Sequence, residues 1–151
     1  MPTPTEDDIK HAHQRAWDWF ALHSNQRMQT FNYFLVATVF LAGAYGSMLE
    51  KNAGAAAFAA LAGAWISLWF RRMDVRTRQL IESSRAPLIK LQDKLAELTE
   101  IEELRMSINV AINWKGASTY SRVIDVTQGT VGISFLAAAI YAAYLALKPH
   151  L

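Results

Sequence analysis

No cysteine occurs among the 151 residues, which excludes disulfide bridges, thiolate nucleophiles and metal sites built on Cys ligands. Also missing are a Walker loop, a G-x-G-x-x-G turn and a G-x-S-x-G elbow. The histidines show no H-E-x-x-H spacing, and His11 and His13 point apart on a helix because they are two residues apart. We therefore expect no catalytic residue, no cofactor and no metal, and we expect that the chain is not an enzyme.

Charged residues are absent from three long stretches, residues 28–49, 52–70 and 126–147. A core helix of a soluble protein alternates apolar and polar faces, whereas a bilayer requires an apolar surface all round. Helices of 18 to 22 residues rise roughly 27 to 33 Å, close to the thickness of the hydrocarbon core. The sequence therefore predicts an all-α integral membrane protein with transmembrane helices at 31–49, 53–70 and 127–147.

The basic residues gather on one side of these spans. Of the 15 Lys and Arg residues, ten lie between Arg71 and Arg122, and three precede the first span. The positive-inside rule then places the N-terminus and residues 71–126 in the cytoplasm. No cleavable signal peptide is expected, because an acidic segment precedes the first apolar run.

Helix signals divide the chain into elements within one membrane domain, residues 1–151. Thr5, followed by three acidic residues, predicts a helix start near residue 6, and a cytoplasmic or interfacial helix over 6–30 continues into the first span. A turn is expected at Asn52–Gly54. Ser118 or Thr119 can cap the last helix, which should run to Leu147.

Within the cytoplasmic segment 71–126, apolar residues recur at spacings of three, four and seven between Leu80 and Leu104. This pattern is typical of an amphipathic helix and predicts a helical arm. Pro87 should kink that helix or divide it in two.

Small residues line the predicted second and third spans. Helices in lipid associate by close backbone approach, because no hydrophobic force drives them together. These residues can pack the spans within one subunit or pack neighbouring copies in a homo-oligomer. The candidates for oligomer packing are Gly54, Ala59, Gly63, Ser134, Ala138, Ala142 and Ala146.

Polar side chains form a stripe along the first helix and persist past the start of the apolar run. In a ring of copies this stripe would face a water-filled path. An alternative is an interfacial belt in which Trp17, Trp19 and Tyr33 anchor at the headgroups while Arg27 snorkels toward phosphate. The candidates for lining a pore are Arg15, Asp18, Asn25, Gln29 and Asn32.

The basic cluster Arg71–Arg78 follows directly on the second span. Such a cluster is typical of binding to anionic lipid headgroups. Direct nucleic-acid binding is not expected, because no aromatic residue is interleaved among the basic ones.

The stretch HSNQRMQTFNYF carries the pattern H-x-x-Q-R-x-x-x-F-N-[FY]-F and resembles the start of the RipA-type octameric membrane proteins of bacteria. The matching residues are His23, Gln26, Arg27, Phe31, Asn32 and Phe34. The resemblance implies a ring of subunits around a pore in the bacterial inner membrane. It also implies similarity to the membrane accessory proteins of type VI CRISPR systems, some of which carry an Arg followed closely by a His. Here seven residues separate Arg15 from His23, which argues against ribonuclease activity.

Our leading hypothesis is therefore a homo-oligomeric inner-membrane pore or channel-like protein that acts in antiviral defence. Its expected partners are further copies of itself, anionic lipids and a defence-system protein. The alternative is a membrane-anchored scaffold whose cytoplasmic arm binds a protein partner, with Glu100, Glu102 and Glu103 offering an acidic surface.

Overall fold

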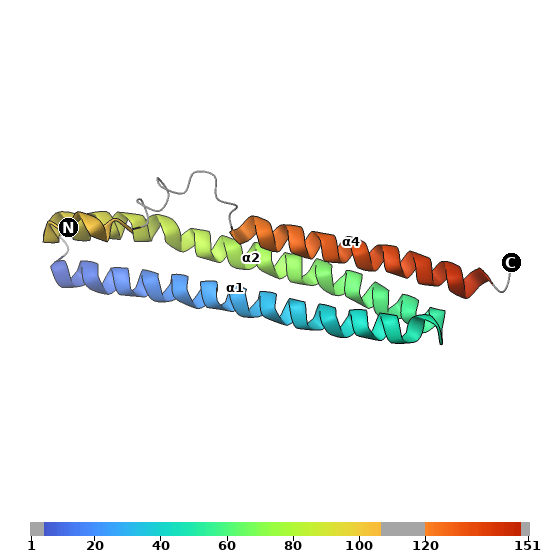
Figure 1. The fold of residues 1–151 in the computed structure, drawn as a ribbon. Helices are drawn as coiled ribbons and strands as arrows, with labels where there is room; N and C mark the ends of the chain where they lie inside the picture. Colours follow the sequence, from blue (N-terminus) through green and yellow to red (C-terminus); the bar gives the residue numbers. More distant parts are fainter. Residues whose placement is uncertain (1–4, 107–119, 149–151) are drawn as a thin grey trace. The chain divides into compact units, whose positions relative to one another are not determined.

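The computed structural model describes residues 5–106 and 120–148. Its elements are α1 (Glu6–Leu49), α2 (Ala53–Thr99), a short 3-10 helix η1 (Glu102–Leu104) and α4 (Tyr120–Leu147) (Figure 1). No β-strand occurs in these residues, so the all-α prediction is confirmed. By length and composition, α1, α2 and α4 are each long and apolar enough to cross a membrane.

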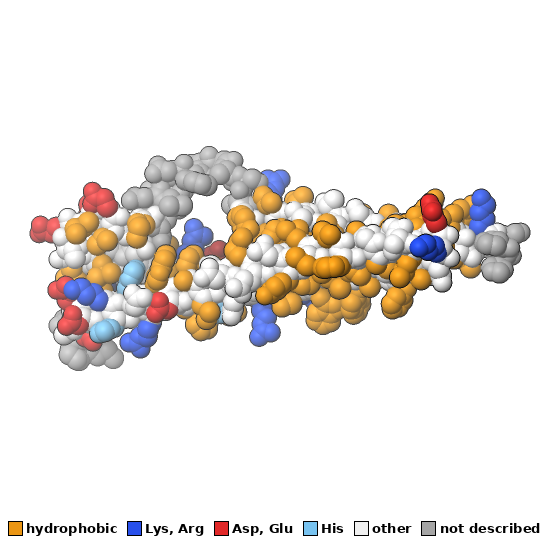
Figure 2. Space-filling view, turned by 60° about the horizontal axis from the view of Figure 1, so that its bottom comes forward, with side chains coloured by type: hydrophobic (Ala, Val, Ile, Leu, Met, Phe, Trp, Pro, Cys, Tyr) orange, Lys and Arg blue, Asp and Glu red, His pale blue; other side chains and the backbone are white. Residues whose placement is uncertain are grey.

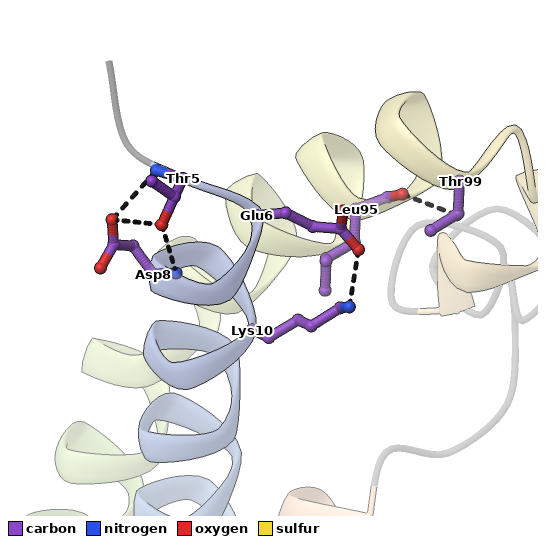
Figure 3. A network of polar contacts seen from close by, with 6 residues as sticks. All are labelled: Thr5, Glu6, Asp8, Lys10, Leu95 and Thr99. Atoms are coloured by element: carbon purple, nitrogen blue, oxygen red, sulfur yellow. Dashed lines mark hydrogen bonds and ion pairs between the residues drawn. The ribbon is translucent and has the colours of Figure 1, made fainter. Parts of the chain in front are cut away.

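Helix α1 begins where its capping signal predicts. The Thr5 hydroxyl accepts a hydrogen bond from the Asp8 backbone N–H at 3.3 Å, and the Asp8 carboxylate accepts bonds from the Thr5 N–H at 3.0 Å and the Thr5 hydroxyl at 2.7 Å (Figure 3). This reciprocal pair satisfies backbone donors that the first helical turn leaves free. The helix then continues for 44 residues without a break, so one helix covers both residues 6–30 and the predicted first span.

The connection between α1 and α2 lies earlier than predicted. The Asn52 backbone N–H donates to the Met48 carbonyl at 2.8 Å, and the Asn52 side-chain oxygen accepts from the Ala55 N–H at 3.0 Å. Asn52 therefore caps α2, and the turn comprises residues 50–52. The turn predicted at Asn52–Gly54 was wrong in register, because Asn52 acts as a helix cap and Gly54 already belongs to the first turn of α2.

Helix α2 joins the predicted second span to the predicted arm as a single element of 47 residues. Pro87 lies inside it and does not divide it, since losing one backbone donor leaves the helix intact on both sides. The predicted helix ran to Leu104, but α2 ends at Thr99. Glu100 has a φ of 57°, and this left-handed conformation ends the helix even though the apolar pattern continues.

Helix α4 ends at Leu147, as its sequence predicts. The capping residues expected for it, Ser118 and Thr119, lie outside the described residues.

Contacts within the chain divide it into two compact units. The polar unit contains residues 1–27 and 76–117, and the apolar unit contains residues 28–75 and 118–151. Helices α1 and α2 each contribute to both units. Hydrophobic side chains and uncharged groups cover most of the visible face of the apolar unit, whereas acidic, basic and histidine side chains are frequent on the polar unit (Figure 2).

The polar unit packs the start of α1 against the second half of α2. Its buried apolar side chains include Ile9, Leu88 and Ala96, which are at most 7% exposed. Trp19 Nε1 donates to the Leu80 carbonyl at 3.3 Å, so a polar contact also joins the two helices.

Three helices share the core of the apolar unit. Ala60 of α2 packs with Phe135 and Ala139 of α4, and Leu41 and Tyr45 of α1 lie against this cluster. Each helix therefore meets both others in this unit, and most of the contacts involve small side chains.

Candidate functional site

The polar stripe of α1 lies outside the packing of its own chain. All five predicted pore-lining residues are exposed in the single chain, and Asp18 accepts a hydrogen bond from Gln14 Nε2 at 2.8 Å. Their spacings of three, four and seven place them on one face of the helix. This face is therefore available to water, to lipid or to another chain; its members are Arg15, Asp18, Asn25, Gln29 and Asn32.

The motif residues divide into a packed pair and an outward-facing group. His23 is buried in the polar unit, where its Nδ1 lies 2.8 Å from the Trp19 carbonyl and its ring centre lies 4.3 Å from that of Trp19. Phe34 is completely buried in the apolar unit and meets Phe70 of α2 at a ring distance of 5.6 Å. Both side chains are thus enclosed by the fold of their own chain, and Phe34 packs α1 against α2.

The other motif residues remain on or near the surface. Gln26 and Asn32 are exposed, while Arg27 and Phe31 are half-buried. Arg27 makes an interaction within the chain. The motif therefore has two buried side chains and two exposed amides.

Several of the small residues expected at an oligomer interface lie inside the chain's own packing. A Cβ placed on Gly63 would come within 2.6 Å of the Phe135 ring, so α2 and α4 approach each other closely there. Ala59 and Ala142 are buried as well. Their small size is accounted for by packing within one subunit.

The remaining small residues are at least partly exposed. Gly54 and Ser134 are exposed, and Ala138 and Ala146 are half-buried. Packing within the chain does not require glycine at three further positions, because a Cβ at Gly43, Gly46 or Gly129 would meet no heavy atom within 4 Å. Sequence spacing alone did not separate these glycines from those that the fold requires.

The ionisable groups with shifted pKa values, Glu6, Asp8 and Lys10, lie together at the exposed start of α1 (Figure 3). The hydrogen bond from the Thr5 hydroxyl lowers the pKa of Asp8, and the hydrogen bond and charge of Lys10 lower the pKa of Glu6. The same pairing raises the pKa of Lys10. These shifts belong to a helix cap and an i,i+4 ion pair, and they mark no acid–base pair suited to catalysis.

In the described residues, 5–106 and 120–148, no three His, Asp or Glu side chains gather as metal ligands would. Tyr120 to Lys148 contribute a single carboxylate, Asp125. The features that the fold brings forward are therefore surfaces: a polar helix face, exposed small residues and grooves between helices.

These features define an all-helical chain with three helices long and apolar enough to cross a bilayer. The chain is similar to CD-NTase-associated protein 19 of Escherichia coli. The two are 27% identical over 143 residues, which cover 89% of this chain and 92% of that protein. No protein-family model and no solved structure matches the chain.

Proposed function

We propose that this chain is a membrane protein of bacterial antiviral defence whose copies form a pore in the inner membrane. The similarity to a CD-NTase-associated protein extends over nearly the whole chain and supports the defence assignment. The resemblance to RipA-type octameric proteins supports a ring of subunits. In this arrangement the N-terminus and residues 71–126 face the cytoplasm, and the protein performs no covalent chemistry.

One observation carries the pore assignment: amides on one exposed face of α1 extend into its apolar half. Gln29 and Asn32 are exposed in the single chain, on a helix that is apolar enough to cross a membrane. An amide without partners in hydrocarbon costs free energy, so such a face is favoured only against water or another polar surface. A ring of copies that turns these faces toward its axis provides the water.

The same geometry predicts the character of the pore. Its membrane segment would be lined by neutral amides, with Arg15 and Asp18 nearer the entrance. Ion selectivity depends on rings of charge or of aligned carbonyls, and neither lines the membrane segment of this path. We therefore expect weak discrimination between potassium and chloride.

Exposed small residues support the assembly of copies. Gly54 and Ser134 are exposed in the single chain, so they can let a neighbouring helix approach closely. Anionic lipid at the basic cluster after the second span and a defence-system protein at the arm are the further partners of this proposal; no direct contact with nucleic acid is required.

The test is leakage through vesicles that contain the purified protein. Replacing Asn25, Gln29 and Asn32 together by leucine should abolish the release of a trapped dye, because the polar face is lost. Gln26→Leu is the matched control: it removes an exposed amide from the same helix outside the stripe and should leave leakage intact. Unchanged leakage in the triple variant would show that this face lines no pore.

A second candidate function, a membrane-anchored scaffold, is supported by a groove in the polar unit. Trp17, Phe20, Ile81, Leu88 and Met106 line an opening of about 380 Å³, beside the Glu82–Arg85 ion pair. Such an apolar groove can accept a side chain or helix of a cytoplasmic protein. In this case the triple leucine variant would keep its partner while wild-type protein would cause no leakage.

A further inference from the structure

A second groove lies in the apolar unit, between α2 and α4. It encloses about 240 Å³, and its lining combines apolar side chains with three polar residues, Ser67, Arg71 and Gln128. The groove belongs to the part of the chain whose helices are suited to hydrocarbon. What fills an outward-facing groove there must present an apolar surface along most of its length.

Two glycines of α4 shape this groove for different reasons. A Cβ at Gly132 would lie 3.2 Å from Ser67 Cβ, so close packing against α2 favours glycine there. A Cβ at Gly129 would meet no heavy atom within 4 Å. Packing within the chain therefore does not require Gly129, and its missing side chain leaves the groove open.

Arg71 and Gln128 lie toward one end of the groove. Gly63 lies opposite Phe135 and Ser67 opposite Gly132, so α2 and α4 are antiparallel. One turn further along, this register places Arg71 level with Gln128. Both residues line the groove at that level.

Gln128 and Arg71 both have unused hydrogen-bonding capacity. Gln128 is only 2% exposed, yet its side-chain oxygen accepts no hydrogen bond from the described residues. Arg71 is exposed, and no carboxylate within residues 5–106 or 120–148 forms an ion pair with it. An occupant with a hydrogen-bond donor and an anionic group would satisfy both.

We propose that this groove binds a phospholipid. The phosphate pairs with the Arg71 guanidinium, a headgroup O–H or N–H donates to the Gln128 amide oxygen, and an acyl chain lies across Gly129 and Gly132. The terminal torsion of a glutamine is soft, so the amide can turn toward the headgroup. The proposal is independent of whether the assembled protein conducts ions.

Charge complementarity favours a lipid over a second copy of the chain. The carboxylates nearest to this level, Asp74 and Asp125, already make interactions within their own chain, and Asp74 is 3% exposed. A neighbouring copy would therefore offer Arg71 little free negative charge there. A phospholipid supplies the anion and the apolar chain in one molecule.

The expected selectivity follows from the donor that Gln128 needs. Phosphatidylglycerol carries hydroxyl donors and phosphatidylethanolamine carries ammonium donors, whereas the choline headgroup has neither. The site should prefer the first two lipids to phosphatidylcholine. If lipid were held only by the general attraction of the basic residues, its retention would depend on the net charge of the lipid alone.

The experiment is native mass spectrometry of the full-length protein in detergent with added dioleoyl-phosphatidylglycerol, -ethanolamine or -choline. Wild type should retain the glycerol and ethanolamine lipids about tenfold more strongly than the choline lipid, the effect of a lost hydrogen bond to a buried group. Gly129→Leu should lose the bound lipid because its side chain fills the groove. Arg71→Gln should weaken retention by about tenfold, and Gln128→Leu should remove the discrimination against choline.

Two matched controls keep the result specific. Ala137→Leu places the same leucine side chain as Gly129→Leu at an exposed position of α4 outside the groove. Arg122→Gln removes an exposed cation at the start of α4 that belongs neither to the basic cluster Arg71–Arg78 nor to the lining of this groove. Both should bind lipid as wild type does, and circular dichroism of every variant checks that its helices are intact.

Three outcomes would overturn the proposal. Equal retention of all three lipids would mean that no headgroup site exists, and full retention by Gly129→Leu would mean that the groove is not where lipid binds. If Gly129→Leu lowers the number of associated chains while the lipid count per chain stays unchanged, a second copy covers the groove instead.

Discussion

In the polar unit the buried side chains include Leu88, Gln92 and His23, whereas in the apolar unit alanine is the commonest buried residue. On the surface of the apolar unit, in contrast, large apolar side chains are exposed. Val39, Phe40 and Phe58 of the apolar unit are 71%, 75% and 76% exposed. Large apolar residues outside and small ones inside are the pattern expected where the surrounding solvent is itself apolar.

The two units therefore depend on different interactions. Removing an apolar side chain from water stabilises the polar unit by about 25 cal/mol for each Å² buried. If the apolar unit lies in a bilayer, as proposed, lipid contacts a leucine as favourably as protein does, and the unit gains mainly from the close approach of backbones. Contacts such as Gly63 against Phe135 take the place of a conventional hydrophobic core.

The largest expected effect tests this difference with one type of substitution in both units. Leu88→Ala should destabilise the polar unit by about 2–5 kcal/mol, because Leu88 is 4% exposed and its removal leaves a cavity. Leu61→Ala should change the stability of the apolar unit by less than about 0.5 kcal/mol, because Leu61 is 53% exposed and lipid replaces its contacts. Hydrogen exchange resolved by segment measures both, and similar losses in the two units would contradict the comparison.

The next effect concerns the close contact between α2 and α4. Gly63→Ala should destabilise the apolar unit by about 1–3 kcal/mol, because the added methyl group meets the Phe135 ring. Gly129→Ala is the control and should be neutral or stabilising by up to about 1 kcal/mol, since its Cβ meets nothing. Thermal unfolding in detergent compares them.

A rescue sharpens the same test. Phe135→Leu should recover part of the stability lost by Gly63→Ala, because a smaller side chain leaves room for the methyl group. If Gly63→Ala unfolds at the temperature of Gly129→Ala, the two helices are not held by close approach at this point.

The helices were predictable because their signals are local. Thr5 with Asp8 marks the start of α1, and the charge-free stretches mark the three helices that suit a bilayer. The division of the small residues was not predictable, because the local sequence around Gly63 or Gly129 does not say which residue of another helix lies opposite. Only the register of α2 against α4 shows that one meets a ring and the other meets open space.

The end of α2 escaped prediction for a related reason. Apolar spacing continues through Ile101 and Leu104, but it reports which face is buried and not where the backbone reverses. The residue that reverses it, Glu100, is a type that seldom adopts a positive φ. Neither could the sequence assign Gln128, whose unused oxygen depends on the packing around it.

A smaller effect is expected at that helix end. Glu100→Gly should stabilise the polar unit by about 1 kcal/mol, because glycine adopts the left-handed conformation without a steric cost. Glu97→Gly, three residues earlier inside α2, should destabilise it by about 1 kcal/mol. Chemical denaturation followed by segment-resolved hydrogen exchange gives both signs, and two destabilising changes would show that Glu100 is not strained.

The smallest effect lies at the start of α1, where polar contacts act in water. In the folded chain the Thr5 hydrogen bonds hold the pKa of Asp8 below its usual value. A carboxyl whose folded pKa is depressed stabilises the fold above its unfolded pKa, and this contribution is lost as the pH falls through the folded pKa. Acidification should therefore fray the first turn of α1.

Thr5→Ala should raise the pKa of Asp8 toward its usual value and make this fraying less dependent on pH. The pKa of Glu6, which is set by Lys10, should stay unchanged. Titration of the two carboxyl groups by NMR measures both; equal shifts at Asp8 and Glu6 would mean that the substitution unfolds the helix end instead of removing one cap.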